Sequence, residues 1–250
     1  MTEPRTNMTT LPNNTLYLPR NNTLHWSCYV TWTGGKLGNT STSGKRVYID
    51  RFFLGNDNLN TKAIQFGSYI MELMEFEPEH PLVADIPRHP HIEYDLNCMV
   101  GDVPINTHPD SVDIDNTLGV YEYKTALEHR AWNSRMVYKQ KQISFYQMCI
   151  RELKGEWNPQ DNFIVEIPTK RIATETDENG VEWDIVERGD KYLEVTRDTL
   201  EDGSYMPTKM HRRLVTKEEI DRLKDDVIRV GHEISDCYKQ FLEEQMNQII

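Results

Sequence analysis

The chain has 250 residues, of which 38% are hydrophobic, and a formal net charge of −12 at pH 7. This length can bury a sizeable core in one domain, and the excess of acid argues against a protein held on nucleic acid by a generally basic surface. The first 14 residues lack the apolar run of a signal peptide, and no segment approaches the ~18 apolar residues of a membrane span. We therefore expect a cytoplasmic protein without a membrane partner.

The first 45 residues are rich in Asn, Thr, Ser and Gly, a composition typical of irregular structure. We expect residues 1–45 to form an irregular arm. The apolar residues in it predict that the arm packs somewhere: Leu24, Trp26, Tyr29 and Trp32. Residues 46–250 are expected to form one domain, with its core between residues 60 and 170.

Two elements are predicted between residues 60 and 105. Residues 67–75 read as a helix, which places Gly67, Met71 and Glu75 in one row on its surface. Residues 92–101 alternate apolar with mostly polar side chains, and this alternation predicts a half-buried strand.

Residues 109–125 predict a β-hairpin. The apolar residues at strand-like spacing and the turn residues between them are Val112, Ile114, Asp115, Asn116, Gly119 and Val120. Glu122 and Lys124 are two residues apart, so they project from the same face of the second strand. The hairpin brings Asp110 beside them.

Two carboxylates and an ammonium group at one strand end suit metal-assisted hydrolysis of a phosphodiester. The carboxylates of Asp110 and Glu122 can hold a hard divalent cation. The amine of Lys124 can orient or deprotonate a water and offset the negative charge that develops during attack. Such a pattern also arises by chance in chains of this length, so its structural context decides between the two interpretations.

A helix is predicted downstream, from Trp132 to Leu153, because apolar residues recur there at three- and four-residue intervals. It carries Gln142 and Tyr146 on one face. The basic residues around Gln142 are Arg130, Arg135, Lys139 and Lys141. They are either a nucleic-acid contact or an ordinary solvated helix face.

The remainder of the chain predicts a strand, an extension and a final helix. Residues 163–168 read as a strand, and residues 171–215 as a hairpin extension. The sequence from Thr216 to Glu219 is a capping box that opens a helix over residues 216–245. Its long apolar stripe either docks on the chain's own core or forms a coiled-coil seam.

In this order, the motifs resemble the PD-(D/E)XK nuclease superfamily. The matching residues are Gly67 and Glu75 on a helix, then Asp110, Glu122-Tyr123-Lys124, and Gln142 with Tyr146. More narrowly, the order is similar to that of RecB-type exonucleases, including the small stand-alone versions encoded by phages. The resemblance spans residues 46 to 170 and implies a restriction-endonuclease-like αβββαβ core, a mixed α/β (α+β) fold with a mixed central sheet.

The resemblance also implies a set of site residues. Asp110, Glu122 and the carbonyl of Tyr123 would bind Mg²⁺ or Mn²⁺, with Glu75 reaching the cation through a water. Lys124 would position the attacking water. Residues expected to contact nucleic acid are Gln142, Tyr146, Arg135, Lys139 and Lys141.

Two features depart from the resemblance. Many RecB-type nucleases have a histidine ligand where this chain has Met71, which leaves the carboxylates to hold the cation. Some also hold an iron–sulfur cluster, which needs four converging thiolates. The four cysteines here are scattered, at Cys28, Cys98, Cys149 and Cys237, so no iron–sulfur cluster is expected.

The sequence therefore predicts a divalent-metal-dependent DNA exonuclease acting in phage recombination, repair or genome processing. DNA is the expected partner, with a homo-oligomer or a recombination protein as further partners, in the host cytoplasm if the chain is phage-encoded. Two alternatives stay open at this point. One is a structure-specific or restriction-type endonuclease, and the other is a non-catalytic nucleic-acid-binding protein on a nuclease fold.

Overall fold

The structure is a computed structural model that describes residues 16–34, 42–54, 62–127, 132–171, 174–176, 182–184, 187–188, 191–192 and 195–249. The chain divides into two compact units. The first comprises residues 1–57, 97–107 and 221–250, and the second comprises residues 58–96 and 108–220. This division differs from the expected arm over 1–45 and single domain over 46–250. Every candidate site residue belongs to the second unit.

The first unit is mainly helical. Its elements are α1 (Pro19–Asn22), α2 (Trp26–Thr33), α3 (Thr42–Tyr48), the π-helical turn η1 (Ile49–Phe53), the hairpin of β2 (Leu96–Val100) and β3 (Val103–Thr107), and most of α7 (Lys217–Ile249). The prediction of an irregular arm is wrong for residues 16–34, which form α1 and α2. The burial of aromatic side chains stabilises helices there in spite of a composition that favours irregular structure. Trp32 is fully buried edge-on to Tyr48, with 5.2 Å between the ring centroids.

The second unit is built on a six-stranded mixed sheet. The strands are β1 (His91–Ile92), β4 (Ser111–Val112), β5 (Val120–Leu127), β6 (Asn162–Arg171), β11 (Val195–Arg197) and β12 (Lys209–Arg212). They run in the order β1-β4-β5-β6-β11, and β12 also pairs with β6. β5 and β6 are parallel, whereas the other pairs are antiparallel.

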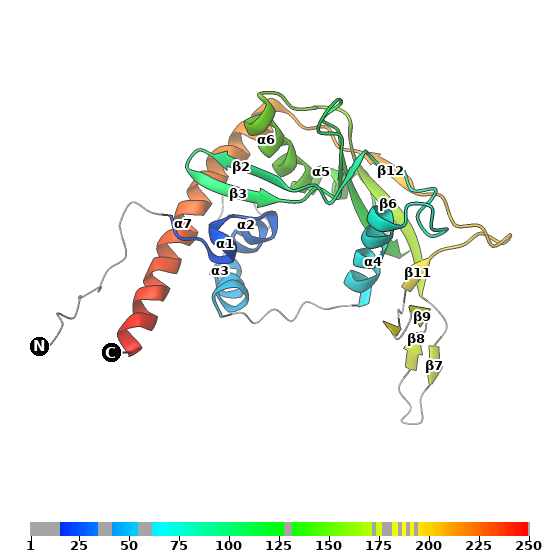
Figure 1. Ribbon diagram of the computed structural model, residues 1–250, viewed down its shortest axis with the longest axis horizontal. Coiled ribbons are helices and arrows are strands. Elements are labelled where there is room, and N and C mark those ends of the chain that lie inside the picture. The colour runs from blue at the N-terminus through cyan, green and yellow to red at the C-terminus, as the bar shows by residue number, and fades with distance from the viewer. Residues whose placement is uncertain are drawn as a thin grey trace, which may run out of the picture. The chain divides into compact units, whose positions relative to one another are not determined.

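Three helices accompany this sheet: α4 (Lys62–Phe76), α5 (Ser134–Lys139) and α6 (Gln142–Lys154). α4 lies against β1, β5 and β11, and α6 lies against β5. Figure 1 shows α4 beside β11. In chain order, the elements α4, β1, β4, β5, α6 and β6 give the αβββαβ arrangement that the sequence predicted.

The predicted strand over 92–101 is wrong as one element. The chain turns at Glu93, which has a left-handed φ of 48° and donates its backbone N–H to the Asp110 carbonyl at 3.1 Å. Only β1 joins the main sheet, and β2 pairs with β3 in a hairpin of the first unit. A polar–apolar alternation continues through the turn, so the pattern alone does not reveal it.

The predicted helix over 132–153 is two helices. Gln140 has an extended backbone (φ −71°, ψ 116°) and ends α5 by donating its N–H to the Met136 and Val137 carbonyls. At the other end, the Asn133 side chain caps α5 by accepting from the Met136 N–H. The apolar spacing runs across the break, and for this reason it predicted one helix.

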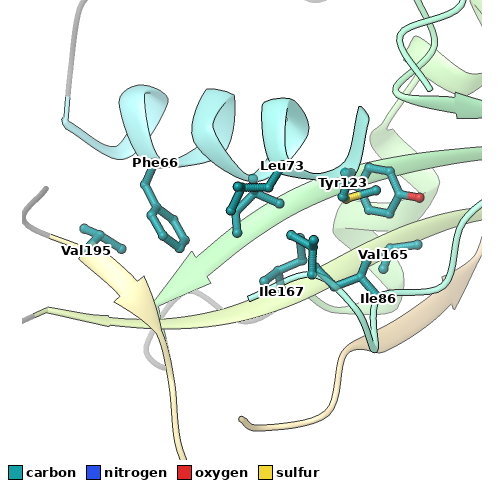
Figure 2. Packing of buried hydrophobic residues seen from close by; sticks show 10 residues of the cluster. Phe66, Leu73, Ile86, Tyr123, Val165, Ile167 and Val195 are labelled. Atoms are coloured by element: carbon teal, nitrogen blue, oxygen red, sulfur yellow. The ribbon is translucent and has the colours of Figure 1, made fainter. Parts of the chain in front are cut away.

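A hydrophobic core joins α4 to the sheet (Figure 2). Phe66 and Leu73 of α4 meet Tyr123 of β5 and the β6 residues Val165 and Ile167. Tyr123 faces α4 in this core. Because alternate residues of a strand face opposite sides of a sheet, its neighbours Glu122 and Lys124 face the other side.

The hairpin extension is present in the residues that the structure describes. β7 (Thr174–Thr176) pairs with β8 (Glu182–Asp184), and β9 (Glu187–Arg188) pairs with β10 (Lys191–Tyr192). None of the described helices has the length and apolarity that crossing a membrane requires.

The final helix α7 agrees with the predicted helix over 216–245. Thr216 Oγ1 accepts from the Glu219 N–H at 3.2 Å, as in half of a capping box. The apolar stripe is fully buried within the chain, at Ile220, Leu223, Val227, Val230 and Ile234. Of the two interpretations of this stripe, docking on the chain's own core is therefore correct.

Candidate active site

The candidate site lies along the edge of β5 that β4 leaves open. β4 pairs with β5 only through Ser111–Tyr121 and Val112–Val120. One step further, the Tyr123 N–H donates to Asp110 Oδ2 at 2.8 Å. A short β4 therefore allows a carboxylate, in place of a strand, to occupy the edge of β5. The predicted hairpin and its convergence of Asp110 with Glu122 and Lys124 are both present.

Glu122 and Lys124 form an ion pair on this strand. Lys124 Nζ donates to Glu122 Oε1. The Glu122 side chain is only 1% exposed, and its other oxygen, Oε2, is buried without a hydrogen-bond partner among the described residues. Burial raises the pKa of Glu122 above its usual range, although the Lys124 ammonium and the nearby Tyr146 side chain oppose the rise. A buried acceptor without a donor is costly, so this oxygen calls for a cation or a donor from outside the chain.

Asp110 shares the electrostatics of that pair. Burial raises the pKa of Asp110 well above its usual range, and the charge of Glu122 adds to the rise. Burial alone would lower the pKa of Lys124, but Glu122 and Asp110 outweigh it and raise that pKa. Two carboxylates crowded beside one ammonium leave an excess of negative charge. A divalent cation would neutralise this excess.

The Gln142–Tyr146 pair is assembled as the sequence predicted. Gln142 Nε2 donates to the Tyr146 hydroxyl at 2.6 Å, and that hydroxyl donates to the His108 carbonyl at 3.0 Å. Burial raises the pKa of Tyr146 well above its usual range, with further rises from Glu122 and Asp110. The hydroxyl therefore stays protonated, and its proton is used on the His108 carbonyl.

A hollow of about 560 Å³ opens between α4 and this strand edge. Asp110 and Lys124 line it together with Glu75 and Met71 from the predicted helical row. Glu93 also lines it and was not among the predicted site residues. The sequence signal for Glu93 was weak because it lay inside an expected strand.

The donor set fits a hard divalent cation. Asp110 and Glu122 supply carboxylate oxygens, and the unpartnered Glu122 Oε2 is the acceptor that such an ion would satisfy. Within the described part of the chain, no group of three or more His, Cys, Asp and Glu side chains could hold a metal ion by itself. The Tyr123 carbonyl and waters would have to complete the shell. None of the four cysteines is in a disulfide, and Cys28 and Cys149 are buried.

The predicted cationic contacts differ in their availability. Arg135 and Lys139 are exposed on α5. Lys141 Nζ instead donates to Glu219 Oε1 at 2.8 Å, and Arg213 also binds Glu219. Arg135 and Lys139 are therefore better placed than Lys141 to meet a ligand from solution.

Asp113 is a structural residue of the hairpin turn. Its Oδ1 accepts from the Asn116 N–H at 3.2 Å, and its Oδ2 accepts from the Thr117 N–H at 3.1 Å. Burial would raise the pKa of Asp113, but the hydrogen bonds from Thr117 and Asn116 outweigh it and lower that pKa.

We expect Asp113→Asn to lower the free energy of unfolding by ~1 kcal/mol and to leave any activity of the candidate site near the wild-type level. Because the folded-state pKa is depressed, this stabilisation is present above the unfolded pKa and is lost as the pH falls through the folded one. The difference in stability between wild type and variant, measured in urea, should therefore shrink below about pH 4. An inactive Asp113→Asn beside an active Asp110→Asn would show that Asp113, and not Asp110, is the motif's acid.

Comparisons with known proteins gave structural likenesses only. A scan against protein-family models found no match, and a search among curated proteins found no similar sequence. An alkaline exonuclease from Laribacter hongkongensis has a TM-score of 0.44 at 10% identity, over 92% of this chain and 95% of that one. A phage-related exonuclease from Haemophilus somnus has a TM-score of 0.46 at 12% identity, over 92% and 97%. At these values, the site residues must carry the assignment of function.

Proposed function

We propose that this chain is a divalent-metal-dependent deoxyribonuclease that hydrolyses phosphodiester bonds from DNA ends. The observation that carries the proposal is the buried, unpartnered Glu122 Oε2 in a site shared with Asp110 and Lys124. A scaffold protein would gain nothing from placing a buried Glu122 beside Asp110, whose pKa is raised by burial and by the charge of Glu122. A cation-binding enzyme uses that arrangement.

The residues of the site divide the work of hydrolysis. Asp110, Glu122 and the Tyr123 carbonyl would hold Mg²⁺ or Mn²⁺, with Glu75 contacting it through a water. The bound cation supplies positive charge against the phosphate oxygens and makes a water more acidic. The Lys124 ammonium donates to the attacking water and orients it toward phosphorus. As the water oxygen forms the new P–O bond it loses a proton, and the 3′ oxygen takes up a proton as its bond to phosphorus breaks, which leaves a 5′-phosphate and a 3′-hydroxyl.

Gln142 and Tyr146 would contact the nucleic acid close to the scissile phosphate. The Tyr146 hydroxyl is held from one side by Gln142 and donates on the other to the His108 carbonyl. Because its one proton is donated to the His108 carbonyl, the Tyr146 hydroxyl would act by holding the Gln142 amide in place, and that amide, with its second N–H, would donate to a phosphate oxygen. Arg135 and Lys139 of α5 would bind the DNA backbone further from the scissile phosphate. Lys141 would join them only if its ion pair with Glu219 breaks.

Exonuclease action is proposed over endonuclease action because the motif order is similar to that of RecB-type exonucleases. The proposed setting is recombination, repair or genome processing in a phage, in the host cytoplasm. A homo-oligomer or a recombination protein would keep the enzyme on its substrate. A structure-specific or restriction-type endonuclease remains the second candidate, since the same core serves both reactions.

Digestion of matched linear and circular DNA with Mg²⁺ tests this proposal. We expect the linear form to be degraded to nucleotides or short fragments and the covalently closed circle to persist, with neither changed in EDTA. Cleavage of the circle would identify an endonuclease. Binding of DNA without cleavage in either Mg²⁺ or Mn²⁺ would identify a non-catalytic protein on this fold.

A further inference from the structure

A second hollow adjoins the candidate active site. It measures about 700 Å³ and lies at the C-terminal end of α4, where Glu75 lines it as well as the catalytic hollow. Pro78, Arg88, Pro90, His91 and Tyr94 form much of its wall. A DNA strand that places a phosphate beside Asp110 and Lys124 can therefore reach the second hollow by passing Glu75.

The backbone turn at Glu93 divides the two hollows. Glu93 lines the catalytic hollow, whereas its neighbours Ile92 and Tyr94 line the second one. The left-handed φ of 48° at Glu93 and its N–H bond to the Asp110 carbonyl fix this division. A non-glycine residue in that conformation is uncommon and often marks a functional position.

The two hollows differ in charge. Four carboxylates line the catalytic hollow, those of Glu72, Glu75, Glu93 and Asp110, and they suit a cation. Of the described residues that line the second hollow, Glu75 at the shared border carries a carboxylate and Arg88 carries a guanidinium. The second hollow is therefore less acidic than the catalytic one, in a chain with a net charge of −12.

Aromatic and cationic groups in the second hollow match a nucleobase with its phosphate. The rings of His91 and Tyr94 lie 5.2 Å apart between centroids, and His91 Nε2 is held by Asp115 at 3.0 Å. Arg88 Nη2 donates to the Pro78 carbonyl at 3.0 Å, while its Nη1 is buried without a hydrogen-bond partner in the described part of the chain. A guanidinium N–H without an acceptor, next to aromatic rings, favours a flat ligand that carries a hydrogen-bond acceptor.

We propose that this second hollow binds the unpaired base of the nucleotide next to the scissile phosphate. Tyr94 would stack on the base, and Arg88 would meet an oxygen acceptor of the same nucleotide. The proposal rests on the proposed nuclease function and adds to it that the degraded strand is unpaired where it enters the site. Tyr94 is thus a substrate-binding residue that acts on the base and not on the reacting phosphate.

The first experiment removes the nucleobase from the substrate and the aromatic ring from Tyr94, separately and together. The substrates are linear duplexes whose degraded strand is intact or carries an abasic analogue at its terminal or penultimate nucleotide, for each strand end in turn. With Mg²⁺, wild type should lose about tenfold in kcat/KM at one of these positions. Tyr94→Ala should lose a similar factor on intact DNA, mainly through KM, and show no further loss on the abasic substrate. Such non-additivity is the signature of a direct contact.

Two control variants separate stacking from folding. Tyr94→Phe keeps the ring and should retain the wild-type preference for the intact strand. Leu153→Ala removes an exposed apolar side chain of α6 that lines neither hollow, and it should leave both rates unchanged. Full discrimination against the abasic strand in Tyr94→Ala would overturn the proposal.

A binding measurement keeps the proposal testable apart from catalysis. A 2-aminopurine placed at the sensitive position reports stacking in Ca²⁺, where no cleavage is expected. At equal occupancy, the emission should differ between wild type and Tyr94→Ala and agree between wild type and Tyr94→Phe. If wild type cleaves nothing yet shows this difference, only the nuclease assignment fails. If the three proteins give the same emission, the base-binding hollow is refuted whether or not DNA is cleaved.

Discussion

Lys124→Ala and Asp110→Ala should each lower DNA cleavage by more than ~10²-fold while the protein stays folded. Lys124 is the one amine in the ion pair with Glu122, and Asp110 is the carboxylate fixed by the Tyr123 N–H. Removing the first takes away the group that orients the water, and removing the second takes away a proposed cation ligand. Rates with excess Mg²⁺ on linear DNA measure both effects.

Stability should respond differently in the two variants. Asp110→Ala relieves the repulsion from Glu122 that helps to raise the Asp110 pKa, so its melting temperature without metal should equal or exceed that of wild type. Lys124→Ala leaves Glu122 without its partner and should be somewhat less stable. Lys154→Ala, at the exposed end of α6, is the matched control and should retain full activity. Near-normal cleavage by either site variant would remove the assignment of the active site.

The core of the site could be predicted from sequence because its determinants are local. A two-residue period fixes which face of β5 carries Glu122 and Lys124, and a turn of a few residues brings Asp110 back beside them. The four-residue spacing of Gln142 and Tyr146 likewise predicted their contact correctly, even though the predicted helix is interrupted at Gln140.

The features that were missed depend on contacts between distant residues. Arg197 is fully buried on β11 and paired with Asp85, 112 residues earlier in the chain. Glu219 follows the capping-box pattern, yet its carboxylate binds Lys141 and Arg213. Glu93 enters the site through a single backbone turn within an alternating sequence. No periodicity encodes such pairings, because each is decided by which segments the folded chain brings together.

The crowded carboxylates also lead to a prediction about metal binding. Because burial raises the pKa values of Asp110 and Glu122, and the charge of Glu122 raises that of Asp110 further, the folded state without a cation loses stability as the pH rises through those values. A divalent cation that binds only the folded state should offset this loss and raise the melting temperature. The rise should shrink at acidic pH, where protons compete for the same oxygens.

Ca²⁺ should bind this site without supporting turnover, whereas Mn²⁺ should support cleavage at least as well as Mg²⁺. The proposed ligands are all oxygens, from Asp110, Glu122, the Tyr123 carbonyl and water, and Met71 occupies the position where a nitrogen ligand would favour softer metals. The reaction needs a compact ion that acidifies its water and holds it in line with phosphorus, and Ca²⁺ is larger with looser geometry.

Titration calorimetry of wild type and Glu122→Gln measures the binding. Glu122→Gln keeps the shape of the side chain but loses its charge, so it should bind each ion at least ~10-fold more weakly. Undiminished binding by this variant, or full cleavage by wild type in EDTA, would remove the claim that these carboxylates hold a catalytic cation.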